Sequence, residues 1–107
     1  MGGRSLAKIL DDDLIYQVLS VVAEIPVGCV ASYGQIAGLI GRPKNARLIG
    51  KILSMAEFYG DYPCHRVVDH RGRPAPHFTE QRDLLTEEGV TFKTDGCVDM
   101  GKHRWKC

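Results

Sequence analysis

The sequence lacks a long apolar run. None of its segments approaches the about 20 consecutive apolar residues that a membrane-spanning helix needs. The first residues, MGGRSLAKILDDD, hold an apolar stretch that is too short for a signal peptide and that runs into three aspartates. We therefore expect a cytoplasmic protein that makes no contact with a membrane.

The sequence also lacks the cysteine pairs on which metal sites and disulfide frameworks depend. Its four cysteines are Cys29, Cys64, Cys97 and Cys107, and no two of them form a C-x-x-C pair. A structural zinc site of the usual kind is therefore not expected. The irregular spacing and the absence of an export signal favour reduced thiols over two disulfides. We expect neither a metal nor another cofactor.

Repeats and low-complexity stretches are absent as well. A chain of 107 residues with 44% hydrophobic and 25% charged residues is ordinary for one globular domain with a modest core. We expect a flexible tail at residues 1–10, one domain over residues 11–107, and a monomer.

Charge is nearly balanced in total but unevenly distributed. The net charge is +1, yet residues 42–51 carry four basic residues and no acid, while residues 11–24 carry four acids and no base. A local basic stripe fits contact with a phosphate backbone. A solvated helix face explains the charge pattern equally well. The basic residues are Arg42, Lys44, Arg47 and Lys51.

Apolar spacing predicts a first helix from Asp13 to about Ile25, where Pro26 and Gly28 break the pattern. The aspartates at its start suit a helix N-terminus by capping and by their charge. The segment SYGQ that follows is a capping box. In this interpretation Ser32 caps a second helix and the Gln35 side chain reaches back to the cap.

The second helix is short and stops at Gly41-Arg42-Pro43. A third helix begins at Lys44 or Asn45, with a buried face of Leu48, Ile49, Ile52, Leu53 and Ala56. Two short helices joined by a tight turn, the second one basic at its start, are typical of a helix-turn-helix.

The second half of the chain contains shorter elements. Residues 64–68, CHRVV, are a β-prone run. Thr79 is expected to cap a further helix that Gly89 ends in the C′ position. The pattern of residues 90–100 predicts two strands that flank a turn at Thr94-Asp95-Gly96 and form a hairpin or wing. The expected fold is mainly α with a small β wing, a winged helix-turn-helix.

Cys64 and His65 are adjacent, so a nucleophile with its base is one interpretation. A free thiol with a pKa of about 8.5 is only roughly 3% thiolate at neutral pH and needs a base. Neighbours in an extended strand point to opposite faces, so a direct hydrogen bond requires a turn or a bridging water. A carboxylate should orient the imidazole, and Glu87 and Glu88 are the candidates.

Metal binding is the alternative chemistry for this segment. Cys64, His65, His70 and His77 lie within fourteen residues. Their spacing matches no zinc pattern, and adjacent ligands are uncommon. Residues 64 and 65 taken alone also allow a purely structural role.

The strings SYGQIA, GRPKNARLIG and PCHRVV, in this order, resemble the C-terminal domain of the O6-alkylguanine-DNA alkyltransferases. The resemblance extends from about Leu14 to Trp105. It implies a winged helix-turn-helix that enters the minor groove of double-stranded DNA and flips O6-alkylguanine into a pocket. It also implies a single-turnover methylated-DNA-[protein]-cysteine S-methyltransferase activity.

The resemblance assigns roles to individual residues. Cys64 corresponds to the alkyl acceptor, His65 to the base that acts through water, and Glu88 to the carboxylate that orients it. Tyr33 is implied to press on the phosphate of the flipped nucleotide, and Arg47 to fill the vacated place in the base stack. The implied DNA-binding residues are Tyr33, Gln35, Arg42, Lys44, Asn45, Arg47, Gly50 and Lys51, and those of the lesion pocket are Tyr33, Pro63, Cys64, Val67 and Arg71.

The sequence also departs from the alkyltransferase pattern. Ala56 takes the place of an asparagine eight residues before the cysteine, and Tyr62 that of an aliphatic residue before Pro-Cys. The loop HRGRPAPHFTEQ replaces a glycine-rich stretch that lines the guanine pocket. This loop, the short chain and Trp105 are similar to the alkyltransferase-like proteins, which bind the lesion and pass it to nucleotide excision repair proteins.

Three functions follow as expectations. The first is recognition of O6-alkylguanine with irreversible alkyl transfer to Cys64. The second is lesion recognition without transfer, because the loop after the motif is altered. The third is a winged-helix regulator in which Cys64 is a buried or redox-sensing thiol. Binding to duplex DNA is common to all three.

Overall fold

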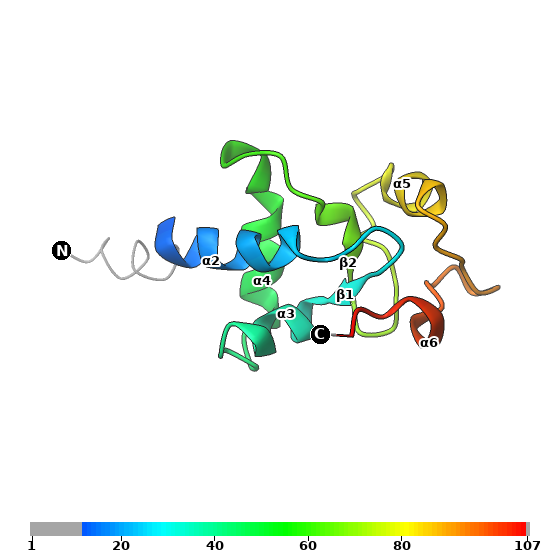
Figure 1. Cartoon of the computed structure of the whole chain (residues 1–107), viewed down its shortest axis with the longest axis horizontal. Helices are drawn as coiled ribbons and strands as arrows, with labels where there is room; N and C mark the ends of the chain where they lie inside the picture. The colour runs from blue at the N-terminus through cyan, green and yellow to red at the C-terminus, as the bar shows by residue number, and fades with distance from the viewer. Residues whose placement is uncertain (1–11, 107) are drawn as a thin grey trace.

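The computed structural model describes residues 12–106 as a mainly helical fold with a small two-stranded sheet (Figure 1). The tail expected at residues 1–10, Asp11 and Cys107 lie outside the described residues. In chain order the elements are α2 (Asp12–Ala23), β1 (Ala31–Ser32), α3 (Tyr33–Leu39), α4 (Ala46–Ser54), the 3-10 helices η1 (Ala56–Phe58) and η2 (Cys64–Arg66), β2 (Val67–Val68), α5 (Gln81–Glu87) and α6 (Met100–His103).

The predicted first helix is confirmed as α2, with Asp12 and Asp13 in its first turn. Its apolar stripe is buried, as the spacing predicts, and α2 contacts both α3 and α4. No helix within residues 12–106 is long and apolar enough to cross a membrane. The buried residues of the stripe are Leu14, Ile15, Val18, Leu19 and Val22.

Half of the predicted capping box is present at α3. Ser32 is the N-cap, and its side chain accepts the main-chain N–H of Gln35 at 3.0 Å. The prediction that the Gln35 side chain reaches back is wrong, because its Nε2 donates to the carbonyl oxygen of Trp105 at 2.7 Å. The C-terminal segment brings this carbonyl close, since the Trp105 N–H donates to Val30 O at 2.7 Å.

The third predicted helix is confirmed as α4, with Asn45 as N-cap. Gly41, at φ +77°, and the Arg42 N–H, which donates to Ala37 O at 2.8 Å, turn the chain between α3 and α4. The two helices pack against each other. Ile49 and Ile52 are fully buried between the helices, so the amphipathic pattern of α4 determines which face is left to solvent.

The segment CHRVV is a strand only at its end. Cys64–Arg66 form the 3-10 helix η2, in which the Arg66 N–H donates to Pro63 O at 3.0 Å, so the prediction of strand at these three residues is wrong. β2 then pairs in parallel with β1, with Ala31 opposite Val67 and Ser32 opposite Val68.

The N-cap of the helix after the loop lies one residue later than predicted. Glu80, not Thr79, is the N-cap of α5, and no side chain caps it. The predicted ending is confirmed, because Gly89 adopts φ +88°. The N–H groups of Gly89 and Val90 donate to Thr86 O and Leu85 O at 3.0 Å each, which is a Schellman motif.

The predicted hairpin is reduced to one antiparallel bridge, between Phe92 and Val98. The Lys93 N–H donates to Cys97 O at 2.8 Å, and Gly96 at φ +86° closes the turn. The ladder does not extend, because the Val90 N–H donates to Leu85 O at 3.0 Å and Met100 already begins α6. The chain reversal is present, but the two predicted strands are not.

The core consists of two clusters that meet at the sheet. Ala31 and Val67 point into the larger cluster with α2, α3 and α4, which we call the main cluster. Their neighbours Val30 and Val68 point the other way, because successive residues of a strand alternate in direction. They pack in a smaller cluster, here called the α5 cluster, with Leu85, Val90 and Val98.

Candidate functional site

Cys64 lies where the two clusters meet. Its side chain packs against the main cluster, and the residue begins η2 directly before β2. Burial, and after it the negative charge of Asp61, raises the pKa of the thiol from 9.0 to about 11. The resting side chain is therefore a neutral thiol at neutral pH.

His65 and Glu88 are hydrogen-bonded, as the sequence predicts for a base and its orienting carboxylate. His65 Nε2 lies 2.7 Å from Glu88 Oε2, and both side chains are about 15% exposed. The other candidate, Glu87, is exposed. The Schellman motif after α5 ends the helix at Glu88 and places its carboxylate beside η2.

Arg66 binds the same carboxylate. Its Nε donates to Glu88 Oε1 at 2.9 Å and its Nη2 to Glu88 Oε2 at 2.8 Å, while Nη1 donates to the carbonyl of Ile25 at 2.8 Å. Chiefly because of Arg66, with His65 adding to it, the pKa of Glu88 is lowered from 4.5 to about 2. Glu88 is thus ionised at neutral pH.

The ionised carboxylate determines which ring nitrogen of His65 carries the proton. A carboxylate accepts hydrogen bonds only, so Nε2 is the N–H that faces Glu88. Nδ1 is left with a lone pair that can accept a proton. Within residues 12–106 no hydrogen bond joins the Cys64 thiol to this ring, so transfer between them requires a water or a small movement.

Tyr33 starts α3 beside the sheet and shares a small cavity, of about 80 Å³, with Cys64 and Val67. Burial, then the charges of Asp69 and Cys64, raises the pKa of the Tyr33 phenol, which keeps its proton. Two residues of the predicted lesion pocket, Tyr33 and Val67, are therefore brought to Cys64.

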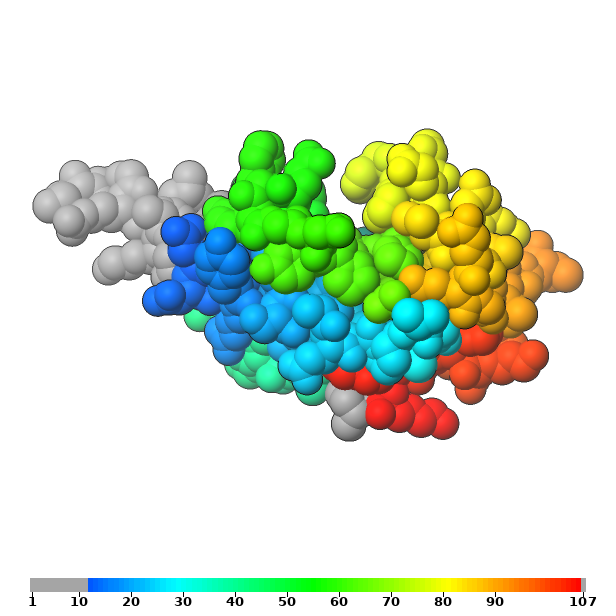
Figure 2. Space-filling view, turned by 45° about the horizontal axis from the view of Figure 1, so that its top comes forward, coloured from blue at the N-terminus to red at the C-terminus, as the bar shows by residue number. Residues whose placement is uncertain are grey.

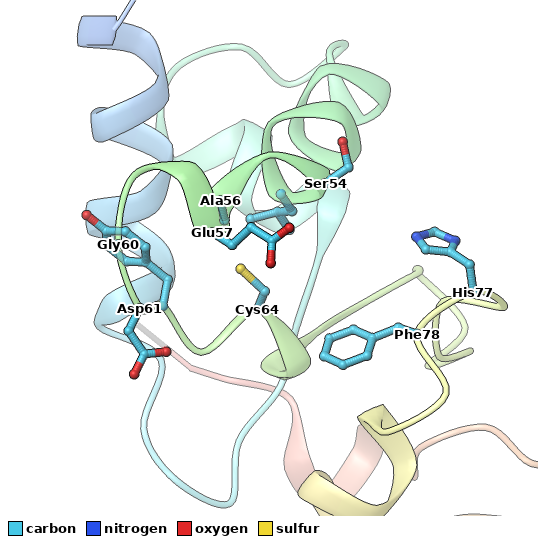
Figure 3. Close-up of a pocket in the computed structure, with 10 residues that line it drawn as sticks. Ser54, Ala56, Glu57, Gly60, Asp61, Cys64, His77 and Phe78 are labelled. Carbon is cyan, nitrogen blue, oxygen red and sulfur yellow. The ribbon is translucent and has the colours of Figure 1, made fainter.

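A larger cavity, of about 450 Å³, adjoins the small one and shares Cys64, His77 and Phe78 with it (Figure 3). The Cys64 sulfur points toward Ala56 and Glu57, and the rings of His77 and Phe78 lie across the opening. In Figure 2 this region is a hollow between the green segment after α4 and the yellow segment before α5. We call it the thiol cavity; its volume lies in the range of small-ligand sites.

Pro63 lies beside Cys64 in a third depression, but Arg71 is not brought to the predicted lesion pocket. Arg71 lies in the turn after β2, where the carboxylate of Asp69 accepts its main-chain N–H at 2.9 Å. This turn faces residues 93–97 rather than Cys64, so Arg71 lines a separate basic depression with Arg73 and Lys93.

Gln81 is a site residue that the sequence did not reveal. It is 1% exposed, and its Oε1 accepts the N–H of Ala75 at 2.7 Å. Its Nε2 donates to the carbonyls of His65 and Val67 at 3.0 and 2.8 Å. Gln81 therefore ties the loop that carries His77 and Phe78 to the segment that carries Cys64. Arg66 was missed in the same way, since both act through partners far along the chain.

The residues predicted to bind DNA lie along α3, the turn and α4. Arg42, Lys44, Arg47 and Lys51 are exposed, and none of them pairs with a carboxylate of the described chain. Gly50 lies on the half-exposed side of α4, where an added Cβ would be 3.9 Å from the Tyr33 ring.

Asn45 and Gln35 make hydrogen bonds within the protein. The Asn45 carbonyl accepts the N–H groups of Leu48 and Ile49 at 3.0 and 3.3 Å, which starts α4. Gln35 Nε2 donates to the Trp105 carbonyl, while its buried Oε1 has no hydrogen-bond partner among the described residues. Among residues 12–106, no three His, Cys, Asp or Glu side chains gather in a way that could hold a metal ion.

Comparisons with known proteins agree on one family. The family described as "6-O-methylguanine DNA methyltransferase, DNA binding domain" matches residues 13–90. The "DNA base-flipping protein" of Escherichia coli (strain K12) is 36% identical over 98 residues, which cover 89% of this chain and 76% of the relative. "Alkyltransferase-like protein 1" of Schizosaccharomyces pombe is 36% identical over 104 residues, which cover 89% and 96%.

Solved structures give the same result. S. pombe Atl1 in complex with damaged DNA containing O6-carboxymethylguanine matches with a TM-score of 0.80 and 31% identity, over 92% of this chain and 99% of that chain. Mycobacterium tuberculosis OGT in complex with DNA matches with a TM-score of 0.61 and 31% identity, over 74% and 51%. From its fold, its Cys-His-Glu arrangement and these matches, the chain belongs to the family of the 6-O-methylguanine DNA methyltransferase DNA-binding domain.

Proposed function

We propose that this protein recognises O6-alkylguanine in double-stranded DNA by flipping the base from the minor groove, and that Cys64 takes up the alkyl group irreversibly. The observation that carries the proposal is the thiol cavity next to an ordered His65–Glu88 pair. Unpaired cations on the turn and on α4 support DNA binding, since they release counterions from a phosphate backbone.

α3 and α4 act in this proposal as the helix-turn-helix, and the turn at residues 92–98 as a reduced wing. Arg47, exposed in the first turn of α4, occupies the place of the flipped base. Extrusion costs a few kcal/mol of stacking, which an inserted guanidinium plane partly replaces. Tyr33 and Gly50 face each other beside α4, where the absence of a side chain at Gly50 leaves room for the sugar-phosphate chain.

The proposed transfer is a displacement at the alkyl carbon by the Cys64 thiolate. The Cys64 thiol proton moves through water to Nδ1 of His65, and the thiolate attacks the alkyl carbon on O6. The S–C bond forms as the C–O bond breaks, and the electron pair stays on guanine, which takes up one proton. Glu88 stabilises the imidazolium, and Arg66 holds Glu88 in place. The product thioether is stable, so each molecule reacts once.

A second candidate function, lesion recognition without transfer, is favoured by the state of the thiol. A pKa of about 11 leaves Cys64 protonated, and at Ala56 a methyl group lines the cavity where the related alkyltransferases carry an amide. Recruitment of nucleotide excision repair proteins would then follow binding. The regulator reading is disfavoured by family membership.

Intact mass after incubation with duplex DNA bearing O6-methylguanine separates the candidates. A gain of one methyl group on the Cys64 peptide, absent in Cys64→Ala, supports transfer. Tight and lesion-selective binding with no adduct supports the second candidate. Equal affinity for modified and unmodified duplex contradicts both, and Arg47→Ala should abolish the selectivity if the base is flipped.

A further inference from the structure

The thiol cavity is lined by two carboxylates. Glu57 comes from η1 and lies beside Cys64 in Figure 3, whereas Asp61 comes from the segment after η1 and lies farther from the sulfur. The same two residues also line the adjoining depression that contains Pro63. A group that extends past the sulfur into either space therefore meets their negative charge.

Within residues 12–106, neither carboxylate takes part in an ion pair. The ion pairs of the described chain join His65 and Arg66 to Glu88, and Arg73 to Asp69. His77 is the one basic side chain of the described residues that lines the thiol cavity. In the second depression, Glu80 adds a third acid, while His65 and Arg66 are both bound to Glu88. The surroundings of the sulfur are thus acidic.

The thiol itself responds to this charge. Burial is the main cause of the raised pKa of Cys64, but Asp61 contributes to it by disfavouring the thiolate. The same field acts on any other anion that is placed at the sulfur.

We propose that the thiol cavity selects among O6 substituents by charge: it takes neutral and cationic alkyl groups and disfavours anionic ones such as carboxymethyl. This inference rests on the proposed function, because the alkyl carbon on O6 must reach the Cys64 sulfur. The remaining atoms of the substituent then lie in the same cavity, next to Glu57 and Asp61. S. pombe Atl1, by contrast, has been crystallised with O6-carboxymethylguanine.

The expected discrimination is modest, because both carboxylates are exposed to solvent. Interactions between exposed charges are weak, so the two carboxylates together should weaken binding of an anionic substituent by only about fivefold to tenfold. The effect should shrink as salt is added, since the Debye length falls to about 3 Å at 1 M.

The test compares four duplexes that differ at one guanine: unmodified, O6-propyl, O6-carboxymethyl and O6-(2-aminoethyl). Binding is measured by fluorescence anisotropy with the Cys64→Ala protein, so that no lesion is consumed. We expect propyl and aminoethyl to bind more tightly than carboxymethyl. The double variant Glu57→Gln/Asp61→Asn in the same background should bring the carboxymethyl-to-propyl ratio close to one.

The readout is the ratio of the affinities for two duplexes, because the removal of two acidic residues raises the affinity for every DNA duplex. Glu87→Gln is the matched control, since Glu87 is exposed and lines neither cavity; it should leave the ratio unchanged. Thermal melting checks that each variant folds.

Three results would overturn the inference in distinguishable ways. Equal or tighter binding of carboxymethyl than of propyl, with both above unmodified DNA, contradicts charge selection and leaves the proposed function standing. No preference for any lesion over unmodified DNA contradicts the proposed function, and the inference falls with it. A ratio that persists in the double variant also contradicts it, because the discrimination would then arise elsewhere.

Discussion

Arg66 and Glu88 are joined by two parallel hydrogen bonds, Nε to Oε1 at 2.9 Å and Nη2 to Oε2 at 2.8 Å. The third nitrogen of the guanidinium donates to Ile25 O, two residues after the end of α2. The Arg66 side chain thus holds the Glu88 carboxylate, which pairs with His65, and links it to the main chain after α2.

Arg66→Lys should therefore destabilise the fold although it keeps the charge. An ammonium group cannot make the paired contact and reach Ile25 O at the same time. We expect a loss of about 1–3 kcal/mol in the free energy of unfolding, measured by urea denaturation. Arg71→Lys is the control, because Arg71 is exposed and only its main chain is hydrogen-bonded. An equal effect in both variants would contradict the assignment.

Glu88 should make stability depend on acid pH. Its pKa is about 2 in the folded protein against 4.5 as the ordinary value, so the contribution is complete above pH 4.5 and is lost as the pH falls through 2. The stability advantage of wild type over Glu88→Gln should be constant from pH 7 to 5 and decline below it. Urea titrations at a series of pH values measure this. Glu87→Gln should show no such decline.

Gly50→Ala should change stability and DNA binding in opposite directions. Alanine is favoured over glycine inside a helix by about 1 kcal/mol, and the added Cβ makes only an ordinary contact with the Tyr33 ring. The melting temperature should rise by a few degrees. Affinity for lesion-bearing duplex should fall if the DNA backbone approaches Gly50, as proposed. Unchanged affinity in a stabilised variant would show that DNA does not contact this position.

Gln81→Leu should loosen the loop above Cys64. The substitution leaves Ala75 N and the carbonyls of His65 and Val67 without their buried partner. Each unsatisfied group costs about 1–3 kcal/mol, so unfolding should become easier by about 2 kcal/mol or more. Gln81→Glu, which keeps Oε1 but loses the donor, separates the two ends of the amide. Proteolysis between residues 74 and 78 is a local readout that should accelerate in both variants.

Asp61→Asn should make Cys64 more reactive. The pKa of the thiol is about 11, and removing the negative charge of Asp61 lowers it. Below that pKa, a lower value means more thiolate and faster alkylation by iodoacetamide. The rate on the Cys64 peptide, followed by mass spectrometry at pH 8 to 10, should increase in the variant. Glu24→Gln removes an exposed acid that lines no cavity at Cys64 and should leave the rate unchanged.

Local patterns in the sequence predict the parts of this fold that local chemistry determines. Apolar spacing predicts α2 and α4, and the capping hydroxyl of Ser32 predicts the start of α3. Gly89 marks the end of α5, because its positive φ is a conformation that favours glycine. The need for an orienting carboxylate left Glu87 and Glu88 as candidates, and only the family resemblance singled out Glu88, which is the one that pairs with His65.

Interactions between distant segments could not be predicted in this way. Arg66 contacts Ile25 and Glu88, and Gln81 contacts residues on both sides of η2, and no periodicity marks either residue. The 3-10 turn at Cys64 depends on the carbonyl of Pro63, which propensity alone does not reveal. Arg71 was misplaced because its turn packs on Val98 through Gly72, whose added Cβ would lie 2.6 Å from Val98 O.

The division of the core into two clusters affects how the molecule opens. The α5 cluster is the smaller, so its amide protons should exchange with solvent through an opening that leaves α2, α3 and α4 folded. Glu88 belongs to the part that opens and Cys64 to the part that stays. Each opening therefore separates His65 from its carboxylate and leaves the imidazole without the group that orients it.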